Sequence, residues 1–166
     1  MWTKYLPTRK KALQGQGMAN RDAFLSMVAV AEGTKGKGDD GYNVIVGGKL
    51  FSGYSDHPRI KVWIRSIQAY STAAGRYQIR RSIFDHYKAV LNLADFSPSA
   101  QDAIAIKLIR ECRALEDVDA GRFDAAVAKC RSRWASFPGA GYGQPEKKIE
   151  ALRAAYESAG GIYGKV

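Results

Sequence analysis

The feature that most constrains the fold of this chain is the helical spacing of apolar residues from Arg76 almost to the C-terminus. Apolar side chains recur there every three or four residues, which places them on one face of an α-helix. The three clearest stripes are Ile83, Phe84, Tyr87, Val90 and Leu91; then Phe123, Val127, Cys130 and Trp134; and then Ile149, Leu152 and Tyr156. The second half of the chain is therefore predicted to be almost entirely helical.

Boundary signals support this interpretation. Ser97 is a favourable N-cap and Pro98 suits the first helical position, so a helix is predicted to begin there. Pro145 is predicted to open the last helix, and Gly160-Gly161 to end it.

The segment before Arg76 contains β-prone residues. Two such runs within Tyr42 to Phe51 flank Gly47-Gly48, a pattern that predicts a hairpin with a tight turn. A further short strand is predicted within Ile60 to Ile67. The predicted fold class is therefore α+β, mainly helical with one small antiparallel sheet near the N-terminal third.

The length of 166 residues fits one domain. The N-terminal Met1 to Gly17 is basic but lacks the apolar stretch of roughly 7 to 15 residues that a secretory signal needs. We expect residues 1–18 to form a basic, flexible arm and residues 19–166 to form the folded domain. No apolar run reaches the roughly 18 to 20 residues that cross a bilayer, so stable membrane insertion is not expected.

The chain carries 26 Lys and Arg against 16 Asp and Glu, a net charge of +10. Such a charge favours polyanionic partners, namely nucleic acid, an anionic membrane or an acidic cell-wall polymer. The charge alone does not choose among them.

Several kinds of chemistry are excluded because the sequence motifs that they require are incomplete or absent. Asn43 to Lys49 superficially resembles a phosphate-binding loop, but it does not begin with Gly, and Leu50 stands where Ser or Thr is required. The sequence contains neither GxSxG nor HExxH. The hairpin turn is therefore the preferred interpretation of this stretch.

No cofactor or metal ion is expected. His57 and His86 are the two histidines, and they are far apart in sequence, whereas zinc commonly takes at least three protein ligands. Cys112 and Cys130 are predicted to be reduced thiols in the core, with a single disulfide as the alternative.

Glu32 has an unusual position in the helix that Asn20 is expected to cap and Arg21 to begin. It falls on the apolar stripe of that helix and beside its C-terminus, where Gly33 suits the helix stop. Burial and the negative end of the helix dipole both disfavour a carboxylate, so the pKa of Glu32 is expected to be raised. Such an acid can act as a general acid near neutral pH. The alternative is that Glu32 turns into solvent at a frayed helix end.

Two further stretches point to carbohydrate. Ser71 to Gln78 and Gly139 to Gln144 each gather small residues, a Tyr and a Gln before a predicted helix, and the first also contains Arg76. Sugars present hydroxyls at their edges and CH groups on their faces, so a cleft for them needs such donors beside aromatic rings. Each stretch alone fits ordinary turn chemistry. With Glu32 they indicate a saccharide groove.

The sequence resembles a known family, the lambda-type endolysins, which are lytic transglycosylases in the lysozyme-like superfamily. The likeness extends from about Arg21 to Gly161. It is carried by six ordered segments: Ala31 to Thr34, Gly41 to Gly48, Tyr54 to Pro58, Ala74 to Gln78, Phe96 to Pro98, and Trp134 to Gln144. The segment Arg59 to Tyr70 is hard to align with the family.

The resemblance implies a lysozyme-like catalytic domain over residues 19–166, with a cleft between a small β-containing lobe and a helical lobe. It also implies that Glu32 is the catalytic acid. A hydrolysing glycosidase normally needs a second carboxylate, and Asp39, Asp40 and Asp56 are the nearest in sequence. One acid suffices if the nucleophile is the substrate's own C6 hydroxyl, which gives a 1,6-anhydro product from peptidoglycan.

Five residues are predicted to bind the substrate: Tyr42, Arg76, Tyr77, Gln78 and Tyr142. Each has a structural alternative. Arg76 is equally suited to an ion pair across the lobes, and Tyr42 to packing against the small sheet. The resemblance further implies peptidoglycan strands as the partner and a holin that opens the inner membrane. Because no secretory signal is recognised, we expect the protein to accumulate in the host cytoplasm until that step, and a monomer is the default expectation.

Three functions are compatible with these residues. The first is a lytic transglycosylase, and the second is a hydrolytic muramidase that uses water in the same cleft. The third is a basic nucleic-acid-binding domain, which only the net charge favours, because no nucleic-acid-binding motif is present. No nucleic-acid partner is therefore expected.

Overall fold

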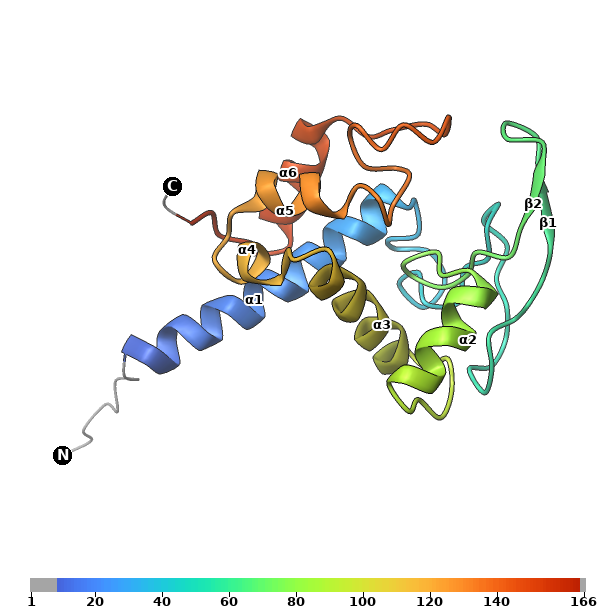
Figure 1. Cartoon of the computed structure of the whole chain (residues 1–166), viewed down its shortest axis with the longest axis horizontal. Helices are drawn as coiled ribbons and strands as arrows, with labels where there is room; N and C mark the ends of the chain where they lie inside the picture. Colours follow the sequence, from blue (N-terminus) through green and yellow to red (C-terminus); the bar gives the residue numbers. More distant parts are fainter. Residues whose placement is uncertain (1–8, 165–166) are drawn as a thin grey trace.

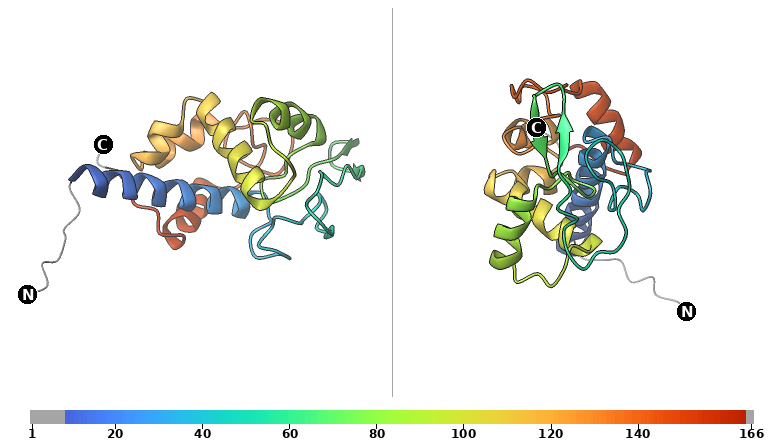
Figure 2. Two further views of the ribbon diagram at one scale, coloured as in Figure 1. Left: turned by 90° about the horizontal axis from the view of Figure 1, so that it is seen from below. Right: turned by 90° about the vertical axis from the view of Figure 1, so that its right-hand side faces the viewer.

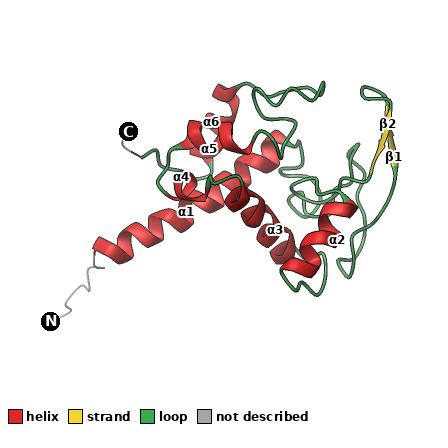
Figure 3. Cartoon of the chain, viewed as in Figure 1, coloured by secondary structure: helices red, strands yellow, loops and turns green. Residues whose placement is uncertain are grey.

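The computed structural model of the protein describes residues 9–164. A bundle of helices forms one part of the molecule, and long loops with a two-stranded sheet form the other (Figure 1 and Figure 3). The helices are α1 (Arg9–Ala31), α2 (Arg81–Val90), α3 (Pro98–Glu111), α4 (Leu115–Asp119), α5 (Phe123–Cys130) and α6 (Ile149–Ser158); the strands are β1 (Val62–Ile64) and β2 (Ala69–Ser71). The predicted α+β class with mainly helical content is confirmed.

Helix α1 begins at Arg9, so the predicted start at Arg21 is wrong. Asn20 lies inside the helix because its side chain has tertiary partners: Nδ2 donates to the Asp119 carbonyl at 3.2 Å, and Oδ1 accepts from the Ile162 amide at 3.0 Å. Residues 9–18 of the predicted flexible arm are helical, while residues 1–8 lie outside the described residues. The N-terminal part of α1 projects beyond the helical bundle, as Figure 1 and the left view of Figure 2 show.

The sheet differs in place from the prediction. Strands β1 and β2 pair antiparallel with Trp63 opposite Tyr70, which confirms the short strand predicted within residues 60–67. The hairpin predicted over residues 42–51 is reduced to isolated bridges, Val44 to Leu50 and Ile45 to Ala74. A tight turn at Gly47-Gly48 is present, but Ile45 also pairs with the later chain, so the run does not extend into two regular strands.

The predicted helix boundaries have different outcomes. The Ser97 hydroxyl accepts from the Ala100 amide, which confirms the N-cap of α3. Helix α6 begins at Ile149, and the predicted start at Pro145 is wrong, because the preceding segment is tied back to a loop by the Lys147 amide, which donates to the Ser136 carbonyl at 2.7 Å. At the other end, Gly160 follows the helix with φ of +87°.

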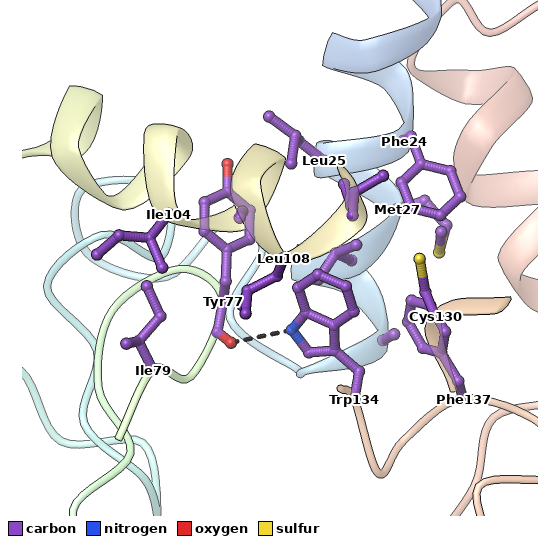
Figure 4. Packing of buried hydrophobic residues seen from close by; sticks show 14 of the residues in the cluster. Phe24, Leu25, Met27, Tyr77, Ile79, Ile104, Leu108, Cys130, Trp134 and Phe137 are labelled. Carbon is purple, nitrogen blue, oxygen red and sulfur yellow. Dashed lines mark hydrogen bonds between the residues drawn. The ribbon is translucent and has the colours of Figure 1, made fainter. Parts of the chain in front are cut away.

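The core is built around α1. Phe24, Met27 and Val28 are completely buried and pack against side chains from the other helices (Figure 4). The indole Nε1 of Trp134, just after α5, donates to the Tyr77 carbonyl at 3.2 Å and so joins the helical part to the loop before α2. The end of α1, where Glu32 lies, is thereby held between the two parts of the molecule.

His57 is also buried. Its Nε2 contacts the Ile79 carbonyl at 2.8 Å, its Nδ1 accepts from the Arg59 amide at 3.0 Å, and its ring stacks on Phe84. Burial, only partly offset by the bond to Ile79, lowers its pKa. No group of three or more His, Cys, Asp and Glu within residues 9–164 is arranged to hold a metal ion. None of the helices in that range is both long and apolar enough to span a bilayer.

Candidate active site

The end of α1 opens into a hollow of about 240 Å³ that is lined by the loops between α1 and α2. The hollow is lined by Glu32, Gly33, Thr34, Lys37, Val44, Ile45, Gly47, Gly48 and Gln78. Among the described residues that line this hollow, Glu32 is the one that carries a carboxylate. A second hollow, of about 360 Å³, lies near Arg110 and Glu116, and Glu32 does not line it.

The backbone fixes where Glu32 stands. The Glu32 amide donates to the Val28 carbonyl at 2.9 Å, and Gly33 then takes a φ of +72°, a conformation that Gly adopts without strain. The Thr34 hydroxyl, which is buried, donates to the Arg76 carbonyl at 2.6 Å. The end of the helix is therefore anchored to the loop before α2 rather than frayed.

The Glu32 carboxyl group is partly buried and has one side-chain partner. The Ser136 hydroxyl donates to Oε1 at 2.7 Å. Burial raises the pKa of Glu32 from 4.5 to about 7, although the bond from Ser136 and the charge of Lys147 both lower it. The group therefore holds its proton over much of the range below neutral pH, which is the condition for a general acid.

The other three carboxylates considered for the reaction are engaged elsewhere. Asp39 accepts a bond of 2.7 Å from the Tyr54 hydroxyl. The pKa of Asp40 is lowered, because bonds from Lys35 and Arg76 outweigh its desolvation. Asp56 pairs with Arg59 at 2.9 Å. None of the three lines the hollow around Glu32.

Gln78 is the predicted substrate-binding residue that lies in the same hollow as Glu32. Its backbone has a φ of +51°, which is uncommon for a residue with a side chain. Its Nε2 donates to the carbonyls of Gly75 at 3.0 Å and Val44 at 3.3 Å. These bonds hold the amide at the wall and leave its oxygen without a protein partner in the described part of the chain.

Tyr42 and Tyr77 lie together behind this wall. Their hydroxyls both donate to Oδ1 of Asp102, at 2.9 Å from Tyr42 and 2.5 Å from Tyr77. The pKa of each phenol is raised: burial is the largest cause, and the negative charge of Asp102 raises the pKa further. The Tyr77 side chain is almost fully buried, and its hydroxyl bonds to Asp102, which is only partly buried.

Arg76 is buried as well. Its guanidinium forms an ion pair with Asp40, donates to the Ser26 hydroxyl at 3.1 Å and lies over the Tyr42 ring at 5.1 Å. Its Nε has no hydrogen-bond partner among the described residues. Arg76 therefore stands in an ion pair, but its partner Asp40 lies in the same loop region between α1 and α2 and not across the lobes, as the alternative above had it.

Tyr142 lies apart from the other predicted residues, on the loop before α6. The residue is 55% exposed, and its hydroxyl donates to the Ser132 carbonyl at 3.2 Å. The same loop is closed by Glu146, which accepts from the Gly139 amide at 2.8 Å and the Gly141 amide at 3.1 Å. The loop thus presents an exposed aromatic ring.

Two residues that order the site were not predicted. Ser136, which bonds to Glu32, belongs to the segment Trp134 to Gln144, but no local pattern connects it with a residue 104 positions earlier. Gln101 is fully buried, accepts from the Arg76 amide at 2.9 Å and donates to the Tyr42 carbonyl at 3.0 Å. The only sign of this role in the sequence is that Gln101 is a polar residue on the inner face of a predicted helix.

Comparison with known proteins agrees with this geometry. The chain matches the Endolysin family over residues 22–163. It is 48% identical over 150 residues to the endolysin of Escherichia phage lambda, covering 88% of this chain and 94% of that protein. It is 47% identical over 156 residues to the endolysin of Escherichia phage P2, covering 86% and 94% respectively.

The fold is likewise shared with a solved structure. Bacteriophage lambda lysozyme in complex with a chitohexasaccharide matches with a TM-score of 0.84 and 46% identity, over 87% of this chain and 96% of that chain. The fold and the site therefore define a lysozyme-like enzyme. With the family match over most of its length, the chain belongs to the endolysin family, the phage enzymes that degrade the peptidoglycan of the host cell wall.

Proposed function

We propose that this endolysin is a lytic transglycosylase in which Glu32 is the catalytic acid and base. The observation that carries the proposal is a single carboxylate in the hollow, with its pKa raised to about 7 and its orientation held by Ser136. A water-using glycosidase normally places a second carboxylate across the scissile bond. A single acid fits a reaction in which the substrate supplies its own nucleophile.

The reaction breaks the β-1,4 bond between N-acetylmuramic acid and N-acetylglucosamine. Glu32 gives its proton to the bridging oxygen as the bond from that oxygen to C1 of the muramic acid breaks. The resulting carboxylate removes the proton from the C6 hydroxyl of the same sugar, and the C6 oxygen bonds to C1. The products are a free 4-hydroxyl and a 1,6-anhydro sugar, Glu32 regains its proton, and no water is consumed.

The substrate-binding residues fall into two groups in this proposal. Gln78 and Tyr142 meet the glycan, because Gln78 lies in the hollow and Tyr142 offers an exposed ring for a sugar face. Tyr42, Arg76 and Tyr77 shape the wall behind Gln78 through Asp40 and Asp102. The chitohexasaccharide bound by lambda lysozyme supports an extended sugar chain as the ligand.

The test is product analysis with Glu32→Gln beside the parent enzyme, on purified sacculi in water enriched in oxygen-18. The parent should release anhydro-muropeptides without the label, and the variant should lose at least about 100-fold in rate, since general acid catalysis is typically worth 10²- to 10⁴-fold. Labelled reducing ends from the parent would identify a hydrolytic muramidase. A variant rate within about tenfold of the parent would remove Glu32 from the mechanism.

The location of the substrate determines what the enzyme must cross in the cell to reach it. The wall lies outside the inner membrane, so an enzyme that accumulates in the host cytoplasm needs that membrane to be opened, and a holin is the partner we propose for this step. We also propose that the enzyme acts as a monomer, with residues 1–18 as an appendage to the catalytic domain over residues 19–166. Light scattering of the pure protein would test the monomer directly.

A further inference from the structure

The β1–β2 hairpin projects from the molecule at the end opposite the start of α1 (Figure 1 and Figure 2). Side chains on a strand alternate between two faces, and the pairing of Trp63 with Tyr70 puts both rings on the same face. The rings touch edge to face with centroids 5.1 Å apart, yet Trp63 is 52% and Tyr70 67% exposed. Two large aromatic rings are thus displayed in solvent.

This face is turned away from the hollow of Glu32. Val62 and Ile64 lie on the other face of the hairpin and are only partly exposed. The Val62 Cγ1 atom approaches Gly47, a residue that lines the hollow, to within 3.8 Å of where its Cβ would be. Since Trp63 alternates with Val62, the Trp63 side is the outer face of the hairpin.

Cations stand on both sides of the aromatic pair. Lys61 directly precedes β1 and Arg65 directly follows it, so each is two residues from Trp63, and both are exposed. At about 3.3 Å per residue of extended chain, their Cα atoms are no more than roughly 13 Å apart. No Asp or Glu occurs between Asp56 and Asp85, and those two acids pair with Arg59. Lys61 and Arg65 have no ion pair within residues 9–164, so positive charge remains at both ends of β1, beside the two rings.

We propose that the outer face of the hairpin, formed by Trp63 and Tyr70 and flanked by Lys61 and Arg65, is a second binding site for peptidoglycan, distinct from the catalytic hollow. The aromatic rings provide apolar faces for the CH groups of sugar rings. The flanking cations match the free carboxylates of the stem peptides that peptidoglycan carries along its glycan strands. The proposal rests on the action of this family on peptidoglycan, and it does not depend on how the bond is cleaved.

A second binding site of this kind changes how the enzyme binds an insoluble substrate. An enzyme held to one strand through the hairpin has a high effective concentration at the neighbouring strand, which enters the catalytic hollow. The gain applies to intact sacculi, where two strands lie within reach of one molecule. It does not apply to a short soluble fragment, which occupies the hollow alone.

The experiment measures cosedimentation with purified sacculi at 0 °C, in a Glu32→Gln background so that the sacculi are not consumed. Two double variants are compared, Trp63→Ala with Tyr70→Ala and Lys61→Gln with Arg65→Gln. Each should weaken binding at least about fivefold. The matched control is Lys10→Gln with Lys11→Gln, which removes the same charge at the far end of α1 and should leave binding within twofold. Trp63→Phe with Tyr70→Phe should restore binding, because the rings remain.

Activity gives an independent readout in the enzyme with Glu32 intact. The hairpin variants should clear sacculi at least about threefold more slowly while they turn over a short soluble muropeptide at the parent rate. Unchanged cosedimentation, or an equal loss on the short fragment, would overturn the proposal. If the hairpin variants still bind sacculi but no longer bind phosphatidylglycerol vesicles, the face is instead assigned to a membrane. If they still bind sacculi but no longer bind oligothymidylate, it is assigned to nucleic acid.

Failure of this proposal and failure of the catalytic one are separable. If Glu32→Gln leaves turnover intact, Glu32 is not the acid, but cosedimentation at 0 °C still reports on the hairpin. If the hairpin variants bind normally, the outer face is no wall-binding site, while the product analysis of Glu32 is unaffected.

Discussion

The hydroxyl of Ser136 donates a hydrogen bond of 2.7 Å to Oε1 of Glu32, and so joins two residues that are 104 positions apart in the chain. This bond favours the charged form of the acid, whereas burial favours the neutral form. The balance between the two sets the pH at which Glu32 loses its proton. Ser136 is therefore a positioning residue whose effect should be visible in a pH profile.

Replacing Ser136 by Ala should move the alkaline limb of the kcat/KM profile to higher pH. The parent needs protonated Glu32, so its rate should fall as the pH rises through about 7. Without the hydroxyl, the charged form loses a stabilising bond and the pKa of Glu32 rises further. Ser136→Thr, which keeps a hydroxyl, is the control. A limb that stays in place or moves to lower pH in the Ala variant contradicts this role.

The free energy of unfolding should depend on Glu32 between pH 4.5 and pH 7. The pKa of Glu32 is higher in the folded protein, so its contribution to stability is fully present below 4.5 and is lost as the pH rises through about 7. The size of this contribution is at most about 3 kcal/mol. Urea denaturation of the parent and of Glu32→Gln should therefore diverge as the pH rises from 4 to 8, with the Gln variant gaining relative stability. Parallel curves would show that the carboxyl group is solvated.

Tyr77→Phe should cost stability but leave substrate binding unchanged. The hydroxyl of the buried Tyr77 donates to the partly buried Asp102 at 2.5 Å, and a bond to a charged group is typically worth about 1.5 to 3 kcal/mol. Urea denaturation should show a loss of this order, and KM should stay within about twofold. Tyr42→Phe is a comparison, because its hydroxyl shares the same Asp102 oxygen. A several-fold rise in KM for Tyr77→Phe would place its phenol in contact with the glycan.

The two cysteines should differ in reactivity. Both are free thiols; Cys112 is partly exposed and Cys130 is buried. A hydrogen bond with Cys130, outweighing desolvation, lowers the pKa of Cys112, whereas the same contact and burial raise the pKa of Cys130, so Cys112 is the more readily ionised thiol. Iodoacetamide should label Cys112 in the native enzyme and Cys130 only after unfolding, as peptide mass analysis would show. Cys112→Ser should abolish the native labelling, and rapid native labelling of Cys130 would contradict the assignment.

Short-range signals were enough to predict part of this molecule. The cap at Ser97, the apolar stripes of α2, α5 and α6, and the stop at Gly33 all depend on residues within a few positions of one another. Glu32 could be singled out for the same reason, since an acid on the apolar stripe at a helix end is visible in a short window. Its raised pKa agrees with that expectation.

Contacts between distant segments account for what sequence reasoning missed. Asn20 is a good N-cap by propensity, but its amide bonds to Asp119 and Ile162, so the helix continues through it. Ile45 fits a regular hairpin strand, but it also bridges to Ala74. The partnership of Ser136 with Glu32 likewise exists only in the folded chain. In each case a tertiary partner changes the role that the local pattern indicates.

Helix α1 supplies the central strip of the core and also ends at the acid. Melting the helical bundle therefore dismantles the reaction centre in the same step. We expect no half-folded form of this enzyme that still cuts the wall, so its thermal inactivation curve should superimpose on the loss of its helical circular dichroism.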